Sequence, residues 1–310
     1  MRIIFMGNPT FSVPSLTVLS SSSHEIAAVV TNPDKPQGRG RNPLSTPVAK
    51  CAGDLGIPIV PAENLKDDNL TALLSEFSAD LFVVVAFRIL PERLLEIPKI
   101  GCVNLHGSIL PKYRGAAPIQ RALLNGDSLT GLTTFQLKPS VDTGDVLLKK
   151  EVVIYPSDNC GVLSERMSYV GAQLLKETVD RLESGEIESS QQDNSLATKA
   201  PKINLRMRVI DWSKSTFEIH NLIRALTPKP GVHTVMRGKR LKICRSHTGL
   251  STGTSPGMII SANKNSFRVS CGSGSLQVLE VQVEGKKKMS AREFLAGSKL
   301  TTGDCFDSER

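Results

Sequence analysis

The chain has 310 residues, of which 40% are hydrophobic and 22% charged, and it contains no apolar run long enough to span a membrane. This balance excludes a disordered or transmembrane chain, and the length predicts two domains. Residues 1–200 carry 19 Lys and Arg against 22 Asp and Glu, whereas residues 201–310 carry 19 against 8. The last third is therefore expected to hold a polyanionic partner, unless its charge serves only solubility.

The first two thirds of the chain alternate apolar runs with helical patterns. Runs rich in β-branched residues occupy 2–7, 25–31, 57–62, 81–87 and 101–106, and helical patterns lie at 12–20, 46–55 and 66–77. Strands that alternate with helices in this way indicate parallel βαβ units. Further strands at 132–137 and 145–154 and a helix at 161–182 complete the pattern. We therefore predict an α/β domain over residues 1–187, with a Rossmann-like, mostly parallel open sheet.

The remainder of the chain has a different pattern. Residues 184–204 lose hydrophobic periodicity and are rich in Ser and Gln, which is typical of an extended linker. A helix is predicted over 213–226, with Ser213 as its N-cap. Five short β patterns follow, at 232–236, 240–245, 257–262, 266–271 and 276–281. They favour a small OB-like β-barrel, so we place the linker at 188–205 and a basic barrel domain at 206–310.

The cysteines and the first residues bear on where the protein works. The six cysteines are widely spaced, with no CxxC pair and no Cys/His cluster of zinc-ligand spacing. This favours reduced thiols and no metal. The sequence opens MRIIFMG, without the pattern of a signal or transit peptide, so we expect a cytoplasmic protein.

The first turn of the α/β domain weighs against one common class of enzyme. Residues 7–12, GNPTFS, stand where a dinucleotide-binding fold carries GxGxxG. The glycines that let a pyrophosphate approach the backbone are missing. A nicotinamide enzyme is therefore disfavoured.

Polar side chains gather where the fifth strand ends, in NLHGSILPKYRGAAP at 104–118. Residues i and i+2 of a strand project from the same face, about 6.6 Å apart, so Asn104 and His106 can converge on one atom. Their N–H groups suit a developing oxyanion. Asp142, in a glycine-bearing loop between two strands, is the leading candidate to orient His106 or to accept a proton. With no adjacent nucleophilic Ser or Cys, the trio predicts direct acyl transfer. Each residue taken alone is more consistent with a structural role, and it is the set of three that favours catalysis.

Five motifs, in order along the chain, resemble those of the methionyl-tRNA formyltransferases: FMGNP, NPDKPQGRG, VNLHGSILPKYRGAAPIQRAL, VDTGDVLL and IDWS. The resemblance spans nearly the whole chain, and NLHGSILPKYRGAAPI is typical of the formyl-folate transferase superfamily as a whole. It implies transfer of the formyl group of 10-formyltetrahydrofolate to the α-amino group of methionine on initiator tRNA, for translation initiation. It also implies an enzyme that needs no metal and no membrane, and we expect a monomer.

The resemblance also implies roles for individual residues. Asn104 and His106 would stabilise the tetrahedral intermediate, while Asp142 would hold His106 and take part in removing the proton of the attacking amine. The folate is expected near Phe87, Ile89, Leu90, Ser108, Ile109, Leu110, Pro111, Thr143, Gly144 and Asp145.

One segment departs from the family pattern. The family usually has an alanine, an aromatic residue, a glycine and one further residue before ILP, whereas this chain reads AFRILP at 86–91, one residue shorter and with Arg88 in place of glycine. Because glycine permits close backbone approach, Arg88 is expected to narrow the folate pocket or to alter how the pterin is held.

Basic loops provide the expected contacts with tRNA. The loop at 32–41 holds prolines and glycines that should prevent regular structure. By the resemblance it enters the acceptor end of the tRNA, with Arg39 on the family's key arginine. The basic turns at 237–242 and 285–288 can follow phosphates without sequence preference. The expected tRNA contacts are Lys35, Arg39, Arg41, Arg237, Lys239, Arg240, Lys286, Lys287 and Lys288.

Two alternatives stay open at this point. One is a related formyl-folate transferase or hydrolase that uses a small amine, an amino sugar nucleotide or water as acceptor. The basic C-terminal domain and the GRG loop argue against it, because a small acceptor needs neither. The other is an RNA-binding protein with a vestigial catalytic domain, which the intact trio disfavours. It would retain RNA affinity without folate turnover.

Overall fold

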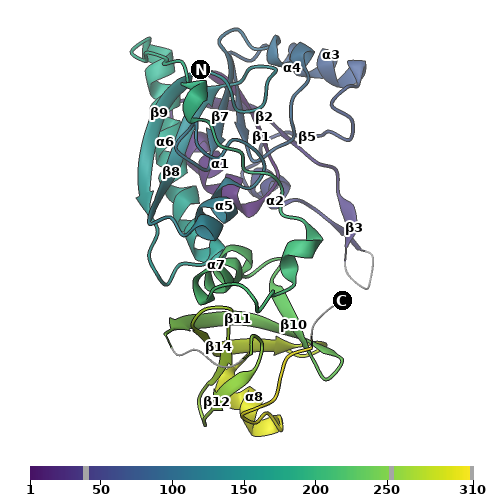
Figure 1. Ribbon diagram of the computed structural model, residues 1–310. Coiled ribbons are helices and arrows are strands. Elements are labelled where there is room, and N and C mark those ends of the chain that lie inside the picture. Colours follow the sequence, from purple (N-terminus) through teal and green to yellow (C-terminus); the bar gives the residue numbers. More distant parts are fainter. Residues whose placement is uncertain (38–41, 251–254, 308–310) are drawn as a thin grey trace. The chain divides into compact units, whose positions relative to one another are not determined.

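The computed structural model of the chain describes residues 1–37, 42–250 and 255–307 (Figure 1). The chain forms two compact units. The first comprises Met1–Pro118, Leu129–Val153 and Ser164–Ala200, and the second comprises Ile119–Ser128, Ile154–Leu163 and Pro201–Arg310. Within the described ranges, no helix combines the length and the apolar character that a membrane crossing requires.

A seven-stranded sheet, in the order β5-β2-β1-β6-β7-β8-β9, forms the centre of the first unit. Its strands are β1 (Arg2–Gly7), β2 (Glu25–Thr31), β5 (Ile59–Pro61), β6 (Leu81–Val85), β7 (Gly101–His106), β8 (Leu129–Gln136) and β9 (Val146–Val153). The strands β5, β2, β1, β6 and β7 are parallel to one another. β8 pairs antiparallel with β7, and β9 pairs antiparallel with β8, on the same side of the sheet. The predicted mostly parallel, Rossmann-like sheet is therefore confirmed.

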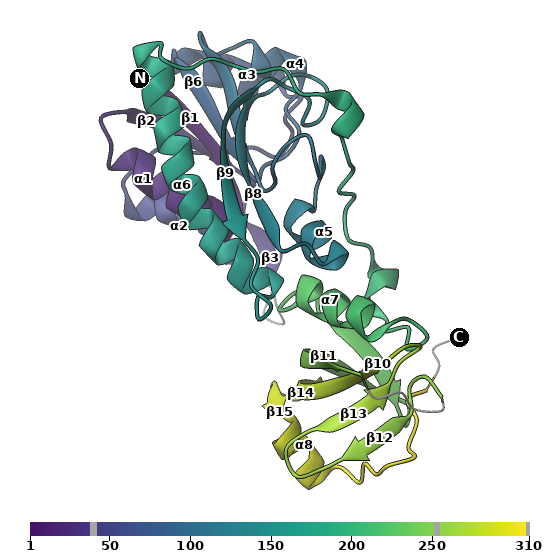
Figure 2. The same cartoon turned by 60° about the vertical axis from the view of Figure 1, so that its left-hand side comes forward.

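Helices cover both faces of this sheet (Figure 2). They are α1 (Val13–Ser20), α2 (Pro47–Asp54), α3 (Asp68–Glu76), α4 (Glu92–Leu95) and α6 (Cys160–Ser184). A further helix, α5 (Pro118–Asn125), belongs to the second unit from Ile119 onward. Ile4 and Phe82 pack with Leu74 of α3 in one core cluster, and all three are fully buried. Burial of each such side chain contributes about 1.5–3 kcal/mol. On the opposite face, a side chain at Gly171 of α6 would collide with Leu105 of β7, so helix and strand pack closely there.

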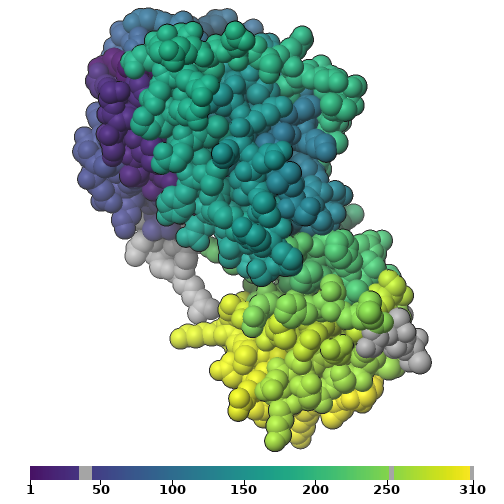
Figure 3. All heavy atoms as spheres, turned by 90° about the vertical axis from the view of Figure 1, so that its left-hand side faces the viewer, coloured from purple at the N-terminus to yellow at the C-terminus, as the bar shows by residue number. Residues whose placement is uncertain are grey.

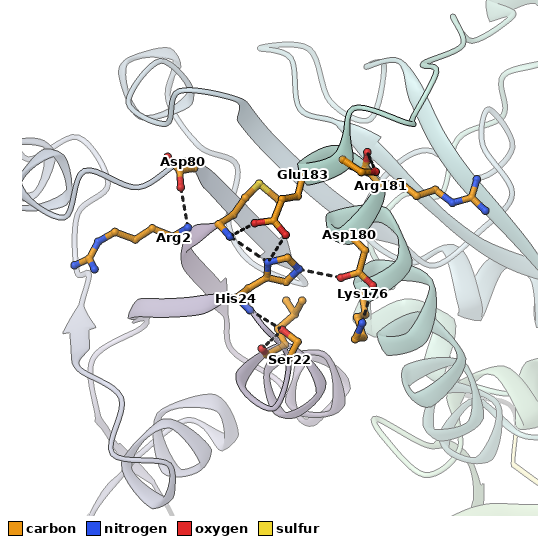
Figure 4. A network of polar contacts seen from close by, with 11 residues as sticks. Arg2, Ser22, His24, Asp80, Lys176, Asp180, Arg181 and Glu183 are labelled. Atoms are coloured by element: carbon orange, nitrogen blue, oxygen red, sulfur yellow. Dashed lines mark hydrogen bonds and ion pairs between the residues drawn. The ribbon is translucent and has the colours of Figure 1, made fainter.

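A polar network joins the residues at the starts of β1 and β2 to the last turns of α6 (Figure 4). The imidazole of His24 lies 2.9 Å from the Asp180 carboxylate, which Lys176 also contacts at 2.6 Å. The α-amino group of Met1 lies 2.5 Å from the carboxylate of Glu183. The space-filling view likewise shows the N-terminal residues, in purple, beside α6, in teal-green (Figure 3).

Two short strands stand apart from the large sheet. β3 (Lys35–Gln37) pairs antiparallel with β4 (Asn42–Leu44), and Pro36 lies opposite Pro43. The expectation that residues 32–41 have no regular structure is therefore wrong at Lys35–Gln37. An antiparallel ladder has pairs that exchange no hydrogen bond, and two prolines opposite each other fit such a pair.

The second unit is built on an antiparallel sheet in the order β10-β11-β14-β13-β12, with β15 added to β14. Its elements are α7 (Thr216–Leu226), β10 (Val232–Met236), β11 (Lys239–Gly249), β12 (Ile259–Ala262), β13 (Phe267–Ser270), β14 (Ser275–Val283), β15 (Met289–Ser290) and α8 (Ala291–Gly297). Trp212 stacks on Phe306 in its core, with ring centroids 5.2 Å apart. The predicted small OB-like β domain is confirmed in fold class.

The N-cap predicted for the helix of this unit is wrong by two residues. Ser215, not Ser213, caps α7: its side chain accepts the Glu218 N–H, and the Glu218 carboxylate accepts the Ser215 N–H. The hydroxyl of Ser213 instead donates to the Asp211 carboxylate. The capping box explains the choice, because only Ser215 has a glutamate three residues later.

The segment expected as a linker is held on the first unit over much of its length. Apart from a 3-10 turn at Asn194–Leu196, residues 188–200 form no helix or named strand. We call residues 188–200 the strap. Ser190 exchanges two backbone hydrogen bonds with Val146, and Ala200 donates one to the carbonyl of Arg114.

Candidate active site

The parallel sheet places Asn104 and His106 at the carboxyl end of β7. That strand lies between β6 and β8, and His106 is opposite Thr133 of β8. Asn104 is half-buried and His106 is 6% exposed. The two residues share a face of the strand, and Leu105, between them, packs toward α6. The carboxyl edge of an open α/β sheet is where such folds bind ligands.

Each ring nitrogen of His106 has a polar neighbour. Its Nε2 lies 2.9 Å from the backbone carbonyl oxygen of Tyr113, and its Nδ1 lies 3.8 Å from Oδ2 of Asp142. Because a carbonyl oxygen can only accept, Nε2 is the nitrogen that carries the proton and donates. Nδ1, on the other side of the ring, faces the Asp142 carboxylate. The structure thus brings His106 and Asp142 together, as the sequence analysis expected, at a separation longer than a hydrogen bond.

Asp142 sits in a tightly constrained loop between β8 and β9. Its φ of +53° is in the left-handed region, and the residue is 9% exposed. Oδ2 accepts the backbone N–H of Gly115 at 2.7 Å. A Cβ at Gly144 would lie 1.6 Å from the carbonyl oxygen of Gln136, so only glycine fits there. These constraints aim the carboxylate at His106.

Two residues that the sequence analysis did not single out complete this arrangement. Gln192 of the strap donates to the carbonyl oxygens of Asp142 and Gly144, and it accepts from the guanidinium of Arg114. Arg114 belongs to the KYRG motif, which was visible in the sequence. Gln192 stands in a polar Ser/Gln-rich stretch that carried no signal for burial.

The segments expected near the folate present few free side chains. Ser108 and Leu110 are fully buried: the Ser108 hydroxyl donates to the carbonyl of Lys112, and Leu110 packs on Phe135. Ile109, Pro111 and Thr143 are partly exposed. Asp145 is paired with Lys138 at 2.9 Å. A ligand at this segment would therefore meet Ile109, Pro111 and backbone atoms.

The segment after β6 lines a shallow pocket, and Arg88 is one of the lining residues. Leu90 is 5% exposed, whereas Ile89 is 71% exposed. Phe87 is half-buried beneath Arg88, whose guanidinium carbon lies 5.1 Å from its ring centroid. The pocket, of about 330 Å³, is lined by Glu63, Asn64, Leu65, Lys66, Arg88, Ile89, Leu90 and Pro91.

The guanidinium of Arg88 donates to the backbone carbonyls of Ala62 and Glu63, the latter at 2.8 Å. Burial lowers the pKa of the Arg88 guanidinium. Arg88 thus ties the end of β6 to the loop after β5, and it forms one wall of the pocket.

The residues expected to contact tRNA fall into three groups. Arg39 and Arg41 lie outside the described residues, and Lys35 is described only as part of the β3 backbone. Arg237 begins the two-residue turn between β10 and β11, and its guanidinium contacts the Asp304 carboxylate at 3.2 Å. Lys288 pairs with Glu280 at 2.8 Å. The remaining four, Lys239, Arg240, Lys286 and Lys287, are exposed.

A second concave region lies within the C-terminal unit. Its volume is about 500 Å³, and Arg208, Arg240 and Lys242 line it together with His233 and Glu284. Three basic side chains around one hollow favour an anionic ligand. In the described part of the chain, no three His, Cys, Asp or Glu side chains are grouped to hold a metal ion.

Comparisons with known proteins give consistent matches. Residues 1–179 match the formyl transferase family, and residues 202–299 match the formyl transferase C-terminal domain family. A methionyl-tRNA formyltransferase of Geobacter metallireducens is 43% identical over 304 residues, covering 98% of this chain and 97% of that protein. One of Thermodesulfovibrio yellowstonii is 44% identical over 302 residues, covering 97% of each.

Two solved structures share the fold. The sugar 3N-formyl transferase WlaRD aligns with a TM-score of 0.67 at 22% identity, over 93% of this chain and 99% of its own. HypX from Aquifex aeolicus aligns with a TM-score of 0.67 at 16% identity, over all of this chain and 51% of its own.

Proposed function

We propose that this chain, which belongs to the formyl transferase family, transfers the formyl group of 10-formyltetrahydrofolate to the α-amino group of methionine on initiator tRNA. The observation that carries the proposal is the His106–Asp142 pair beside Asn104 at the carboxyl edge of the sheet. The length over which the chain matches methionyl-tRNA formyltransferases supports the choice of acceptor.

In the proposed reaction the methionine nitrogen attacks the formyl carbon of the donor. The carbonyl oxygen gains negative charge, which the side-chain amide of Asn104 stabilises by donating a hydrogen bond, with His106 beside it. The attacking amine loses a proton to the Asp142–His106 pair, in which Nδ1 and the carboxylate face each other. The bond between the formyl carbon and the folate nitrogen then breaks, and that nitrogen receives a proton, which leaves formylmethionyl-tRNA and tetrahydrofolate.

A folate donor is consistent with the surroundings of the trio. WlaRD was solved in the presence of 5-N-formyl-THF, and HypX in complex with tetrahydrofolic acid. We propose that the donor lies along Phe87, Ile89 and Leu90, and against Ile109–Pro111 and Thr143–Asp145. The apolar side chain of Ile89 is exposed at this edge and offers a surface on which a pterin ring can pack.

The C-terminal unit is suited to a polyanionic acceptor. Its exposed cations, Lys239, Arg240, Lys286 and Lys287, can contact tRNA phosphates, and we propose that Arg39 and the basic residues near it contact the acceptor end. Affinity for tRNA should then fall steeply with salt. All the proposed catalytic side chains come from one chain, so we propose a monomer that acts in the cytoplasm, where initiator tRNA is used.

The test is transfer of labelled formyl from 10-formyltetrahydrofolate to methionyl initiator tRNA, with elongator methionyl-tRNA and free methionine as parallel acceptors. We expect rapid transfer to the initiator alone. Transfer to a small amine but not to tRNA would replace the acceptor, and RNA binding without any folate turnover would overturn the enzymatic proposal.

A further inference from the structure

Gln192 is the most completely bonded side chain of the strap. It is 6% exposed, although its neighbour Gln191 is exposed. Its Nε2 donates to the carbonyl oxygens of Asp142 at 2.9 Å and Gly144 at 2.7 Å. Its Oε1 accepts from Nε and Nη2 of Arg114, at 3.1 and 2.7 Å. A carboxamide has two N–H donors and two acceptor lone pairs, so every polar position of Gln192 is used.

The Asp142 loop needs these two donors. Asp142 adopts a left-handed backbone conformation, which is less favourable for a residue with a side chain than for glycine. The hydrogen bonds from Gln192 to Asp142 and Gly144 are buried, and a buried carbonyl left without a donor would destabilise this conformation of the loop. Gln192 satisfies the carbonyls on either side of Thr143. It therefore stabilises the one loop conformation in which the Asp142 carboxylate faces His106.

Oε1 of Gln192 contacts the loop of Tyr113 and Arg114, which also bonds His106. Arg114, which Gln192 accepts from, follows Tyr113, whose carbonyl receives the Nε2 proton of His106. The strap also bonds this loop directly, because Thr198 accepts the backbone N–H groups of Tyr113 and Arg114. One side chain thus connects the loop that contacts Nε2 of His106 with the loop that faces Nδ1.

We propose that Gln192 is a positioning residue for formyl transfer, which acts through Asp142 without touching either substrate. The inference rests on the proposed function only for its catalytic consequence. Its geometric part, that Gln192 sets the place of the Asp142 carboxylate, stands apart from any activity. Through this one side chain, the strap helps to hold the Asp142 loop.

The experiment compares substitutions at Gln192 with the same substitutions at Gln191. Gln192→Leu removes the amide at similar volume. Gln192→Glu keeps the shape and the Arg114 contact but replaces the two N–H donors by a carboxylate oxygen, which faces the two carbonyls. It tests the same hydrogen bonds if the leucine variant does not fold. We expect kcat to fall about 10- to 100-fold in both Gln192 variants, with KM for folate and tRNA changed less than about twofold. Gln191→Leu and Gln191→Glu should match the wild type.

A double-variant cycle identifies the route of the effect. If Gln192 acts through Asp142, Gln192→Leu should lower kcat little further in an Asp142→Asn background. Full additivity of the two losses would overturn the proposal, because it would mean an independent role. Wild-type kcat in Gln192→Leu and Gln192→Glu would also overturn it.

A spectroscopic readout separates this inference from the proposed function. The Gly115 amide proton donates to Oδ2 of Asp142 at 2.7 Å. Its NMR resonance should move upfield in Gln192→Leu and in Asp142→Asn, and stay in place in Gln191→Leu. If the wild type shows no formyl transfer while these shifts occur, the proposed function fails and the positioning role of Gln192 stands. An unmoved Gly115 resonance in Gln192→Leu refutes the positioning role, whatever the activity.

Discussion

Nδ1 of His106 lies 3.8 Å from Oδ2 of Asp142, and both side chains are almost fully buried. This separation is too long for a hydrogen bond, which would require about 3 Å between the two atoms. His106 is restrained on its other side by Tyr113, so the Asp142 loop decides how closely the pair approaches. The reactivity of the site should therefore depend on this loop as much as on the residues that touch substrate.

Substitution of Asp142 or Asn104 should slow formyl transfer and leave the binding of both substrates unchanged. Asp142→Asn keeps the shape of the side chain but cannot take up a proton, so kcat should fall about 100- to 10,000-fold. Asn104→Ala removes an oxyanion donor and should lower kcat about 100- to 1,000-fold. Single-turnover transfer at saturating folate measures both.

The matched control for these variants is Glu96→Gln, which changes an exposed carboxylate of the same unit. It should transfer at the wild-type rate. An Asp142→Asn enzyme as fast as this control would remove Asp142 from the mechanism.

Two glycine-to-alanine substitutions should act in opposite directions. At Gly144 the added Cβ would collide with the carbonyl of Gln136, so Gly144→Ala should destabilise the protein by about 1–3 kcal/mol and lower kcat. At Gly53, in α2, nothing lies within 4 Å of the added atom. Gly53→Ala should stabilise the protein by about 0.5–1 kcal/mol and leave kcat unchanged. Urea unfolding with kinetics on both variants checks this, and equal effects would contradict the close packing at Gly144.

His220 should make stability fall on mild acidification. Burial, together with smaller effects of the positive Arg224 and of His247, lowers the pKa of His220 from its ordinary value of 6.5 to about 4. The folded protein therefore keeps His220 neutral where the unfolded chain takes up a proton. The stability that neutral His220 contributes is fully present above about pH 6.5. As the pH falls toward 4, the free energy of unfolding should decrease by on the order of 2–3 kcal/mol.

The measurement is the free energy of unfolding in urea between pH 7.5 and 4.5. His220→Asn retains a polar group that can bond the Ser246 hydroxyl, which now lies 2.9 Å from Nδ1 of His220. Its profile should be flatter than that of the wild type over this range. Parallel profiles would show that His220 does not carry the dependence.

The six thiols should differ sharply in reactivity. Burial raises the pKa of Cys102 to about 12 and that of Cys271 to about 11, and each side chain is 4% exposed. Cys305 is exposed. Because the thiolate is the reactive form, iodoacetamide at pH 8 should modify Cys305 first and spare Cys102 and Cys271 until the protein unfolds. Mass spectrometry of timed digests measures the order, and early labelling of Cys102 would contradict its burial.

Local patterns in the sequence determined the fold class and the edge on which the site lies. The run at 101–106 became β7 without a change of boundary, and its i and i+2 side chains, Asn104 and His106, share one face. Such features are predictable because burial on a strand or helix repeats with a period that neighbouring residues record. The same reasoning placed the strands β10 to β14 in order along the chain, but it missed the two-residue strand β15, and it failed where a side-chain capping box chose Ser215 over Ser213.

Tertiary structure alone decided how the site is held. No local pattern shows that Gln192 bonds the backbone of Asp142, fifty residues earlier, or that Arg88 turns to the carbonyls of Ala62 and Glu63. These contacts join segments distant in sequence, through polar groups whose partners are backbone atoms that every residue possesses. A backbone carbonyl leaves no mark on the sequence, so which polar side chain satisfies it is settled only when the chain has folded.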